Sequence, residues 1–166
     1  MLTSHELLGF MSPALALEIL TYAYEADKPL YRATLNAVAE ARKVRPVFLE
    51  RQPRTQRHST MLATLSKPAL DMLTGNLIRT WLLKKHNGML TDFLNALEIP
   101  HKEGVVEDLP KSMDDSKLNT AVDGLLAKHP KEAVSVYLHA FNDMNEADWP
   151  NLKSMLDSDP RLQLGV

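Results

Sequence analysis

Apolar residues recur at helical spacing along almost the whole chain, between the breaks made by its ten prolines and six glycines. The clearest stripe lies within residues 68–86 and consists of Leu70, Leu73, Leu77, Ile78, Trp81 and Leu82. Alternation with a period of two, which is typical of a half-buried strand, is not convincing anywhere. The sequence therefore predicts an all-α fold.

The breaks between the apolar stripes divide the chain into about seven expected helices. The first clear one opens at Ser12-Pro13, because serine caps the first N–H groups and proline suits the first turn. Short breaks favour antiparallel hairpins, which we place at residues 13–41, 68–98 and 115–144. These hairpins predict an orthogonal or irregular helical bundle. The alternative is a HEAT-like repeat of helix pairs, suggested by the likeness between residues 82–86 and 125–129.

The length of 166 residues is typical of a single domain, and we expect residues 1–166 to form one. A chain of this size buries roughly 70% of its unfolded surface and needs no disulfide or metal to fold. The lack of cysteine excludes disulfides, thiol catalysis, iron–sulfur clusters and cysteine-bound zinc. The longest apolar stretch, residues 14–23, is interrupted by Glu18 and is shorter than a membrane span. We expect a cytoplasmic protein with no membrane partner.

Motifs for catalysis, metals and cofactors are missing from the sequence. It contains neither H-E-x-x-H nor G-x-S-x-G, and its isolated glycines form no phosphate-binding loop. Glu98 and His101 have the spacing of a di-iron ligand pair, but Pro100 separates them and no second pair exists. His86 and His129 end helices, and His139 is expected to be exposed to solvent. We therefore predict no catalytic residue, no metal ligand and no cofactor.

Charge is distributed unevenly along the chain, although its formal net charge is only −2. Residues 42–67 contain seven basic side chains and one acid, a net charge of +6. Residues 98–160 contain thirteen acids and six lysines, a net charge of −7. Arginine forks match carboxylate and phosphate geometry. The candidate anion- or partner-binding residues are Arg42, Lys43, Arg45, Arg51, Arg54 and Arg57.

Three explanations of the basic segment compete. It is a solvated loop or pairs with the acidic C-terminal half of the same chain, or it binds an acidic protein, which includes the acidic face of a second copy of this chain. It alternatively binds nucleic acid, although only Phe48 is near to stack on a base. The sequence favours a non-catalytic protein-interaction or scaffolding module. The alternatives are a nucleic-acid- or phosphate-binding protein that uses residues 42–67, and a small helical enzyme whose site is assembled from distant residues.

Overall fold

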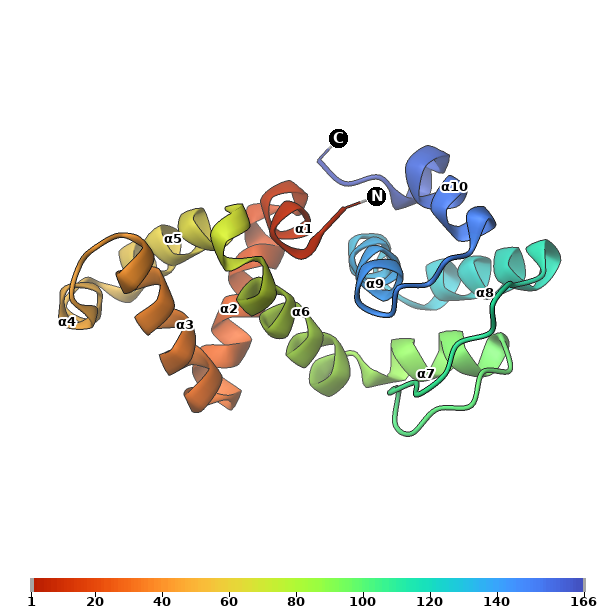
Figure 1. Ribbon diagram of the computed structural model, residues 1–166, viewed down its shortest axis with the longest axis horizontal. Coiled ribbons are helices and arrows are strands. Elements are labelled where there is room, and N and C mark those ends of the chain that lie inside the picture. Colours follow the sequence, from red (N-terminus) through yellow and green to blue (C-terminus); the bar gives the residue numbers. More distant parts are fainter. Residues whose placement is uncertain (1, 166) are drawn as a thin grey trace. The chain divides into compact units, whose positions relative to one another are not determined.

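The computed structural model describes residues 2–165, which are largely helical (Figure 1). Within them lie ten α-helices and two short 3₁₀-helices, no strand, and a helical content of 73%. The all-α prediction is confirmed, but the expected number of about seven helices is too low. Helices such as α1 (Ser4–Phe10) and α4 (Pro46–Glu50) have seven and five residues, which is too short to show helical periodicity.

The chain divides into two compact units: an N-terminal unit, residues 3–81, and a C-terminal unit of residues 82–165 with Leu2. The boundary falls inside α6 (Asp71–Lys85). The N-terminal unit contains ten basic and seven acidic side chains, and the C-terminal unit contains nine and fourteen. The uneven charge of the sequence is therefore also a difference between the units, +3 against −5. None of the helices formed by residues 2–165 is long and apolar enough to cross a lipid bilayer.

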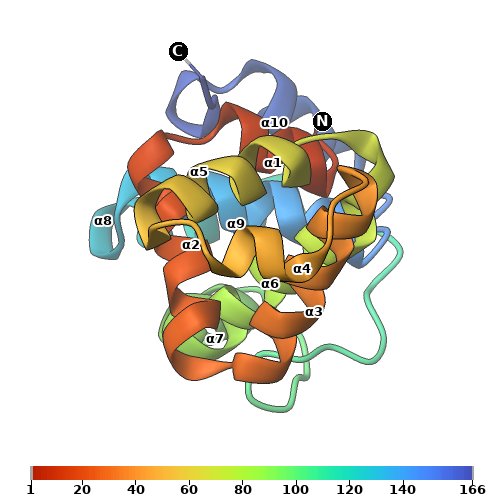
Figure 2. The same ribbon diagram turned by 90° about the vertical axis from the view of Figure 1, so that its left-hand side faces the viewer.

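The N-terminal unit is a group of closely packed helices in which α5 contacts α1, α2 and α3. It contains α1, α2 (Pro13–Ala26), α3 (Lys28–Ala41), α4, α5 (Arg54–Leu65), the 3₁₀-helix η1 (Pro68–Leu70) and the first part of α6. The α2 and α3 helices pack against each other and against α5. Figure 2 looks onto the end of this unit where α3, α4 and α5 follow one another.

The first turns of α2 and α3 are capped by side chains. The Ser12 hydroxyl accepts the Leu15 N–H at 3.2 Å, so α2 begins at Ser12-Pro13 as predicted. Asp27 alone separates α2 from α3, and its carboxylate accepts the Leu30 N–H at 3.1 Å. Because Pro29 lies in the first turn of α3, it does not interrupt that helix.

The C-terminal unit surrounds one buried helix. It contains α7 (Asn87–Ala96), α8 (Asp115–Lys128), α9 (Lys131–Met144), α10 (Pro150–Ser158) and the 3₁₀-helix η2 (Pro160–Leu162). Every residue of α9 from 133 to 142 is buried, and α8, α10 and η2 all pack on this helix. The expected exposure of His139 is therefore wrong: its side chain is buried, and Nε2 lies 3.1 Å from the Leu162 carbonyl oxygen.

The junction between α6 and α7 also differs from expectation. Asn87 and Gly88 do not cap the end of α6; they form the first turn of α7 after the single residue His86. The Asn87 side chain instead donates to the carbonyl of Glu103 at 2.6 Å. The loop expected between residues 101 and 113 is confirmed, and Trp149 Nε1 donates to the Pro110 carbonyl within it at 2.7 Å.

Candidate functional site

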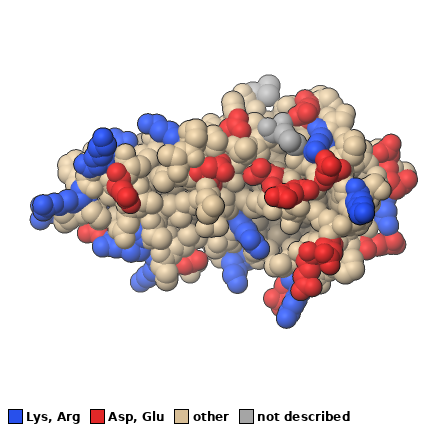
Figure 3. Space-filling model, viewed as in Figure 1, with Lys and Arg blue, Asp and Glu red and all other residues tan. Residues whose placement is uncertain are grey.

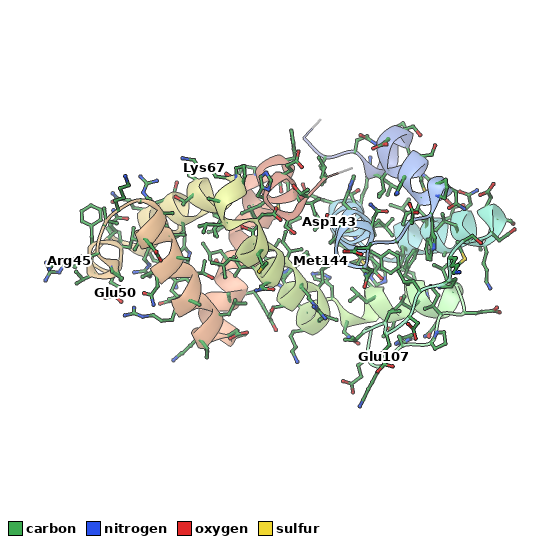
Figure 4. All side chains as sticks on the ribbon, in the orientation of Figure 1. Arg45, Glu50, Lys67, Glu107, Asp143 and Met144 are labelled. Atoms are coloured by element: carbon green, nitrogen blue, oxygen red, sulfur yellow. The ribbon has the colours of Figure 1, made fainter. Side chains whose placement is uncertain are left out.

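The six predicted site residues all lie in the N-terminal unit, along the segment from the end of α3 to the first turns of α5. Arg42 and Lys43 follow α3, Arg45 precedes α4, Arg51 follows α4, and Arg54 and Arg57 belong to α5. Figure 4 shows the Arg45 side chain extending outward beside α4. On the face drawn in Figure 3, Lys and Arg predominate around this end of the unit.

The contacts of these residues separate them into two groups. Arg42 donates to the Thr64 hydroxyl at 3.2 Å, and Arg54 and Arg57 lie over the ring of Tyr24. The side chains of the other three (Lys43, Arg45 and Arg51) make no hydrogen bond or ion pair with another residue that the structure describes. Three of the six predicted residues therefore have side-chain contacts within the N-terminal unit, and the side chains of the other three extend into solvent.

The six predicted cations are not neutralised by a carboxylate of their own segment. The only acid of residues 42–67 is Glu50, and it forms its ion pair with Arg32 on α3. Acids of the C-terminal unit pair with cations of the same unit, as Glu98 does with Lys117 at 2.7 Å and Asp123 with Arg161 at 2.8 Å. Each of these three ion pairs joins residues of the same unit.

A shallow apolar hollow of about 740 Å³ lies against α4. Leu49 is fully buried and anchors α4, whereas Val47 and Phe48 keep 42% and 56% of their surface exposed. Exposed apolar side chains next to one another are typical of binding surfaces. We call this surface the Phe48 face, and its lining residues include Val44, Arg45, Val47, Phe48, Arg51 and Gln52.

Gln52 contributes an unpaired acceptor to the Phe48 face. Its side-chain oxygen is buried and accepts no hydrogen bond from the described residues. A buried polar atom without a partner costs about 1–3 kcal/mol.

A second arrangement brings together α2, α3 and α5. The Tyr24 ring contacts Tyr31 edge-on at a centroid distance of 5.0 Å and His58 at 5.5 Å. The guanidinium carbons of Arg54 and Arg57 lie 5.3 and 5.9 Å from the Tyr24 centroid. We call Tyr24, Tyr31, Arg54, Arg57 and His58 the Tyr24 cluster.

Hydrogen bonds fix the inner part of the Tyr24 cluster. Arg57 Nε donates to the Tyr31 hydroxyl at 2.9 Å, and the same hydroxyl is hydrogen-bonded to His58 Nε2 at 2.9 Å. Burial, together with the charges of Arg57 and Arg54, lowers the pKa of His58 to about 4. Burial also raises the pKa of Tyr31, against the effect of Arg57. Both groups are therefore neutral at pH 7 beside two cations.

Sequence reasoning found the arginines of the Tyr24 cluster but missed its aromatic members. Tyr24 and Tyr31 lie on different helices, and His58 was only one of six scattered histidines. The available signal was the spacing of Arg54, Arg57 and His58, which places the three on one face of α5.

Two other pairs join residues that are far apart in the sequence. His5 Nδ1 lies 2.6 Å from Asp71 Oδ1, which also accepts the His5 backbone N–H at 2.9 Å. His129 Nε2 lies 3.0 Å from Asp92 Oδ2 and connects α8 to α7. Among residues 2–165, no three His, Asp or Glu side chains gather in a group suited to a metal ion.

Comparisons with protein-family models, with curated proteins and with solved structures gave no match for this chain. The Phe48 face and the Tyr24 cluster are therefore the features from which a function can be inferred.

Proposed function

We propose that this protein is a non-catalytic interaction module that binds an acidic segment of a partner protein on the Phe48 face. The observation that carries the proposal is the exposure of Phe48 and Val47 beside Arg45 and Arg51. An apolar side chain of the partner would cover Phe48, and carboxylates of the partner would form ion pairs with the guanidinium groups of Arg45 and Arg51. Aromatic and arginine side chains supply much of the binding energy at protein interfaces.

The lining of the Phe48 face favours a protein segment over a nucleic acid as the occupant. Phe48 is the only aromatic side chain that lines the hollow, and one ring makes a poor platform for stacking several bases.

A display library of random peptides tests the proposal with the full chain as bait. We expect the enriched peptides to combine Asp or Glu with at least one large apolar residue. Phe48→Ser and Arg51→Glu should each weaken binding of an enriched peptide by about tenfold or more. Arg79→Glu is the matched control, because Arg79 is an exposed arginine of α6 in the same unit, and it should leave binding unchanged.

Two outcomes would contradict this function. One is enrichment of peptides that lack acidic residues, and the other is binding that Phe48→Ser and Arg51→Glu do not affect. Sedimentation velocity tests self-association separately. A concentration-dependent mass that Phe48→Ser abolishes would identify the occupant as a second copy of this chain instead of a different protein.

We also infer that the scaffold of this module is a single domain of antiparallel helical hairpins. Contacts between α2 and α3 and between α8 and α9 support two of the three expected pairs. The third, at residues 68–98, and a HEAT-like stacking of the pairs stay predictions, because α7 packs mainly on α8. A cytoplasmic location likewise stays a prediction from the sequence.

A further inference from the structure

The Tyr24 cluster holds two arginines that have no carboxylate partner among the described residues. Arg54 and Arg57 are three residues apart on α5, so they lie on one helical face and approach the same ring. Neither lines the hollow of the Phe48 face. The nearby acid Glu50 forms its ion pair with Arg32. This arrangement is therefore independent of the proposed peptide site.

Arg57 is held in place without being neutralised. Its Nε donates to the Tyr31 hydroxyl at 2.9 Å and its Nη1 to the Glu50 carbonyl oxygen at 3.4 Å. Both acceptors are uncharged, and no hydrogen bond to a described residue uses Nη2. A cation oriented in this way loses little side-chain entropy when it binds an anion.

Arg54 adds a second uncompensated charge beside the first. Its guanidinium group contacts the Tyr24 ring and forms no hydrogen bond with the described part of the chain. Both charges act on His58: after burial, which has the largest effect, they lower the pKa of its imidazole. The side of α5 that carries Arg54 and Arg57 therefore has a positive potential that a bound anion would offset.

We propose that Arg54 and Arg57 bind a phosphate monoester group beside Tyr24. Two guanidinium groups carry two positive charges and several N–H donors, which match the charge and the acceptor oxygens of a phosphate monoester. A carboxylate supplies one charge and two oxygens, so it fits one arginine. Small phosphorylated molecules and phosphorylated side chains both present this group, and the experiment separates them.

The first experiment titrates inorganic phosphate into the full chain at constant ionic strength and follows the His58 imidazole resonances by NMR. We expect saturable shifts and a higher His58 pKa with phosphate than with chloride. Arg54→Gln and Arg57→Gln should each weaken phosphate binding by about tenfold or more. Arg79→Gln removes one exposed charge from the same unit and should have no effect beyond screening.

A second variant excludes loss of folding as the cause. Thr55 is exposed in the first turn of α5, so Thr55→Asp adds a negative charge at the end of the helix that carries the two arginines and that favours acids. Thr55 does not share the face of Arg54 and Arg57, so we expect this variant to fold and to weaken phosphate binding through its charge. Binding that survives in Thr55→Asp, in Arg54→Gln and in Arg57→Gln would overturn the proposal.

Two further probes identify the source of the phosphate. A phosphoserine peptide that binds at least tenfold more tightly than inorganic phosphate would assign the site to a phosphorylated protein, and similar affinities would assign it to small phosphorylated molecules. A short single-stranded oligodeoxythymidine contains phosphodiesters. If only this oligonucleotide binds, or if shifts with phosphate equal those with chloride, the proposal of a monoester site is wrong.

Discussion

The hydroxyl of Tyr31 on α3 is hydrogen-bonded to His58 Nε2 on α5 at a distance of 2.9 Å. The same oxygen accepts the Arg57 Nε–H, also at 2.9 Å. One phenol therefore joins two helices and fixes both a buried neutral base and a cation. The stability of the N-terminal unit and the orientation of Arg57 depend on the same hydrogen bonds.

Replacing Tyr31 with phenylalanine tests this dependence. Tyr31→Phe leaves buried His58 Nε2 and Arg57 Nε without their partner, so we expect the free energy of unfolding to fall by about 1–3 kcal/mol. Tyr22→Phe is the matched control, because the Tyr22 hydroxyl has no hydrogen bond to a residue that the structure describes, so its loss should cost less than about 0.5 kcal/mol. Urea denaturation, followed by circular dichroism, measures the free energy of unfolding of both variants. Equal decreases in the two variants would show that the hydrogen bonds of the Tyr31 hydroxyl do not stabilise the unit.

Stability should fall as the pH is lowered from about 6.5 to about 4. The pKa of His58 is near 4 in the folded chain and 6.5 without the fold, so the unfolded state binds more protons within this window. A shift of this size corresponds to about 3 kcal/mol over the whole window.

A variant isolates this effect of His58. Burial also lowers the pKa of His139, which adds to the pH dependence in the same direction. We therefore compare the change in unfolding free energy between pH values of about 7 and about 5 in the wild type and in His58→Gln, measured in urea. The variant should lose less stability on acidification, and an unchanged loss would show that His58 is not responsible.

The sequence predicts long helices well and short ones poorly. The stripe that ends at Leu82 identified α6, because its apolar residues span several turns. In contrast, α4 has five residues and contributes one fully buried side chain, Leu49, so no periodicity shows it. The exposure of Phe48, on which the proposed function depends, follows from this one turn of helix and was not predictable from spacing.

The burial of α9 in the middle of its unit could not be predicted from the spacing of apolar residues. A single apolar stripe predicts a helix with one buried face, and on that basis His139 was expected to face solvent. In the structure, α9 is covered on all sides, so Ser135, His139 and Asn142 are buried as well. Which helix becomes central depends on long-range packing, which local spacing does not contain.

Thr55→Asp should make the chain more stable, in addition to its effect on phosphate. The first turn of α5 contains no acidic residue. Its N-cap residue, Pro53, has no side-chain acceptor that could cap the first N–H groups of the helix. An acid at this position interacts favourably with the helix dipole, so we expect a gain of about 0.3–1 kcal/mol. Ser59→Asp in the middle of α5 is the control and should not stabilise, because Ser59 is exposed and has no Lys or Arg three or four residues away. Thermal unfolding compares the melting temperatures of both variants with that of the wild type. A lower melting temperature for Thr55→Asp would contradict the expected interaction with the helix dipole.

The two tryptophans test whether the chain is one cooperative domain, because Trp81 lies in the N-terminal unit and Trp149 in the C-terminal unit. The α6 helix continues across the boundary between Trp81 and Leu82, so unfolding of one unit removes part of a helix from the other. We therefore expect a single transition. In Trp149→Phe, fluorescence reports only on Trp81, and in Trp81→Phe only on Trp149. Within each variant, the urea midpoints from fluorescence and from far-UV circular dichroism should coincide. Separate midpoints would show that the two units unfold independently and that residues 1–166 are more than one domain.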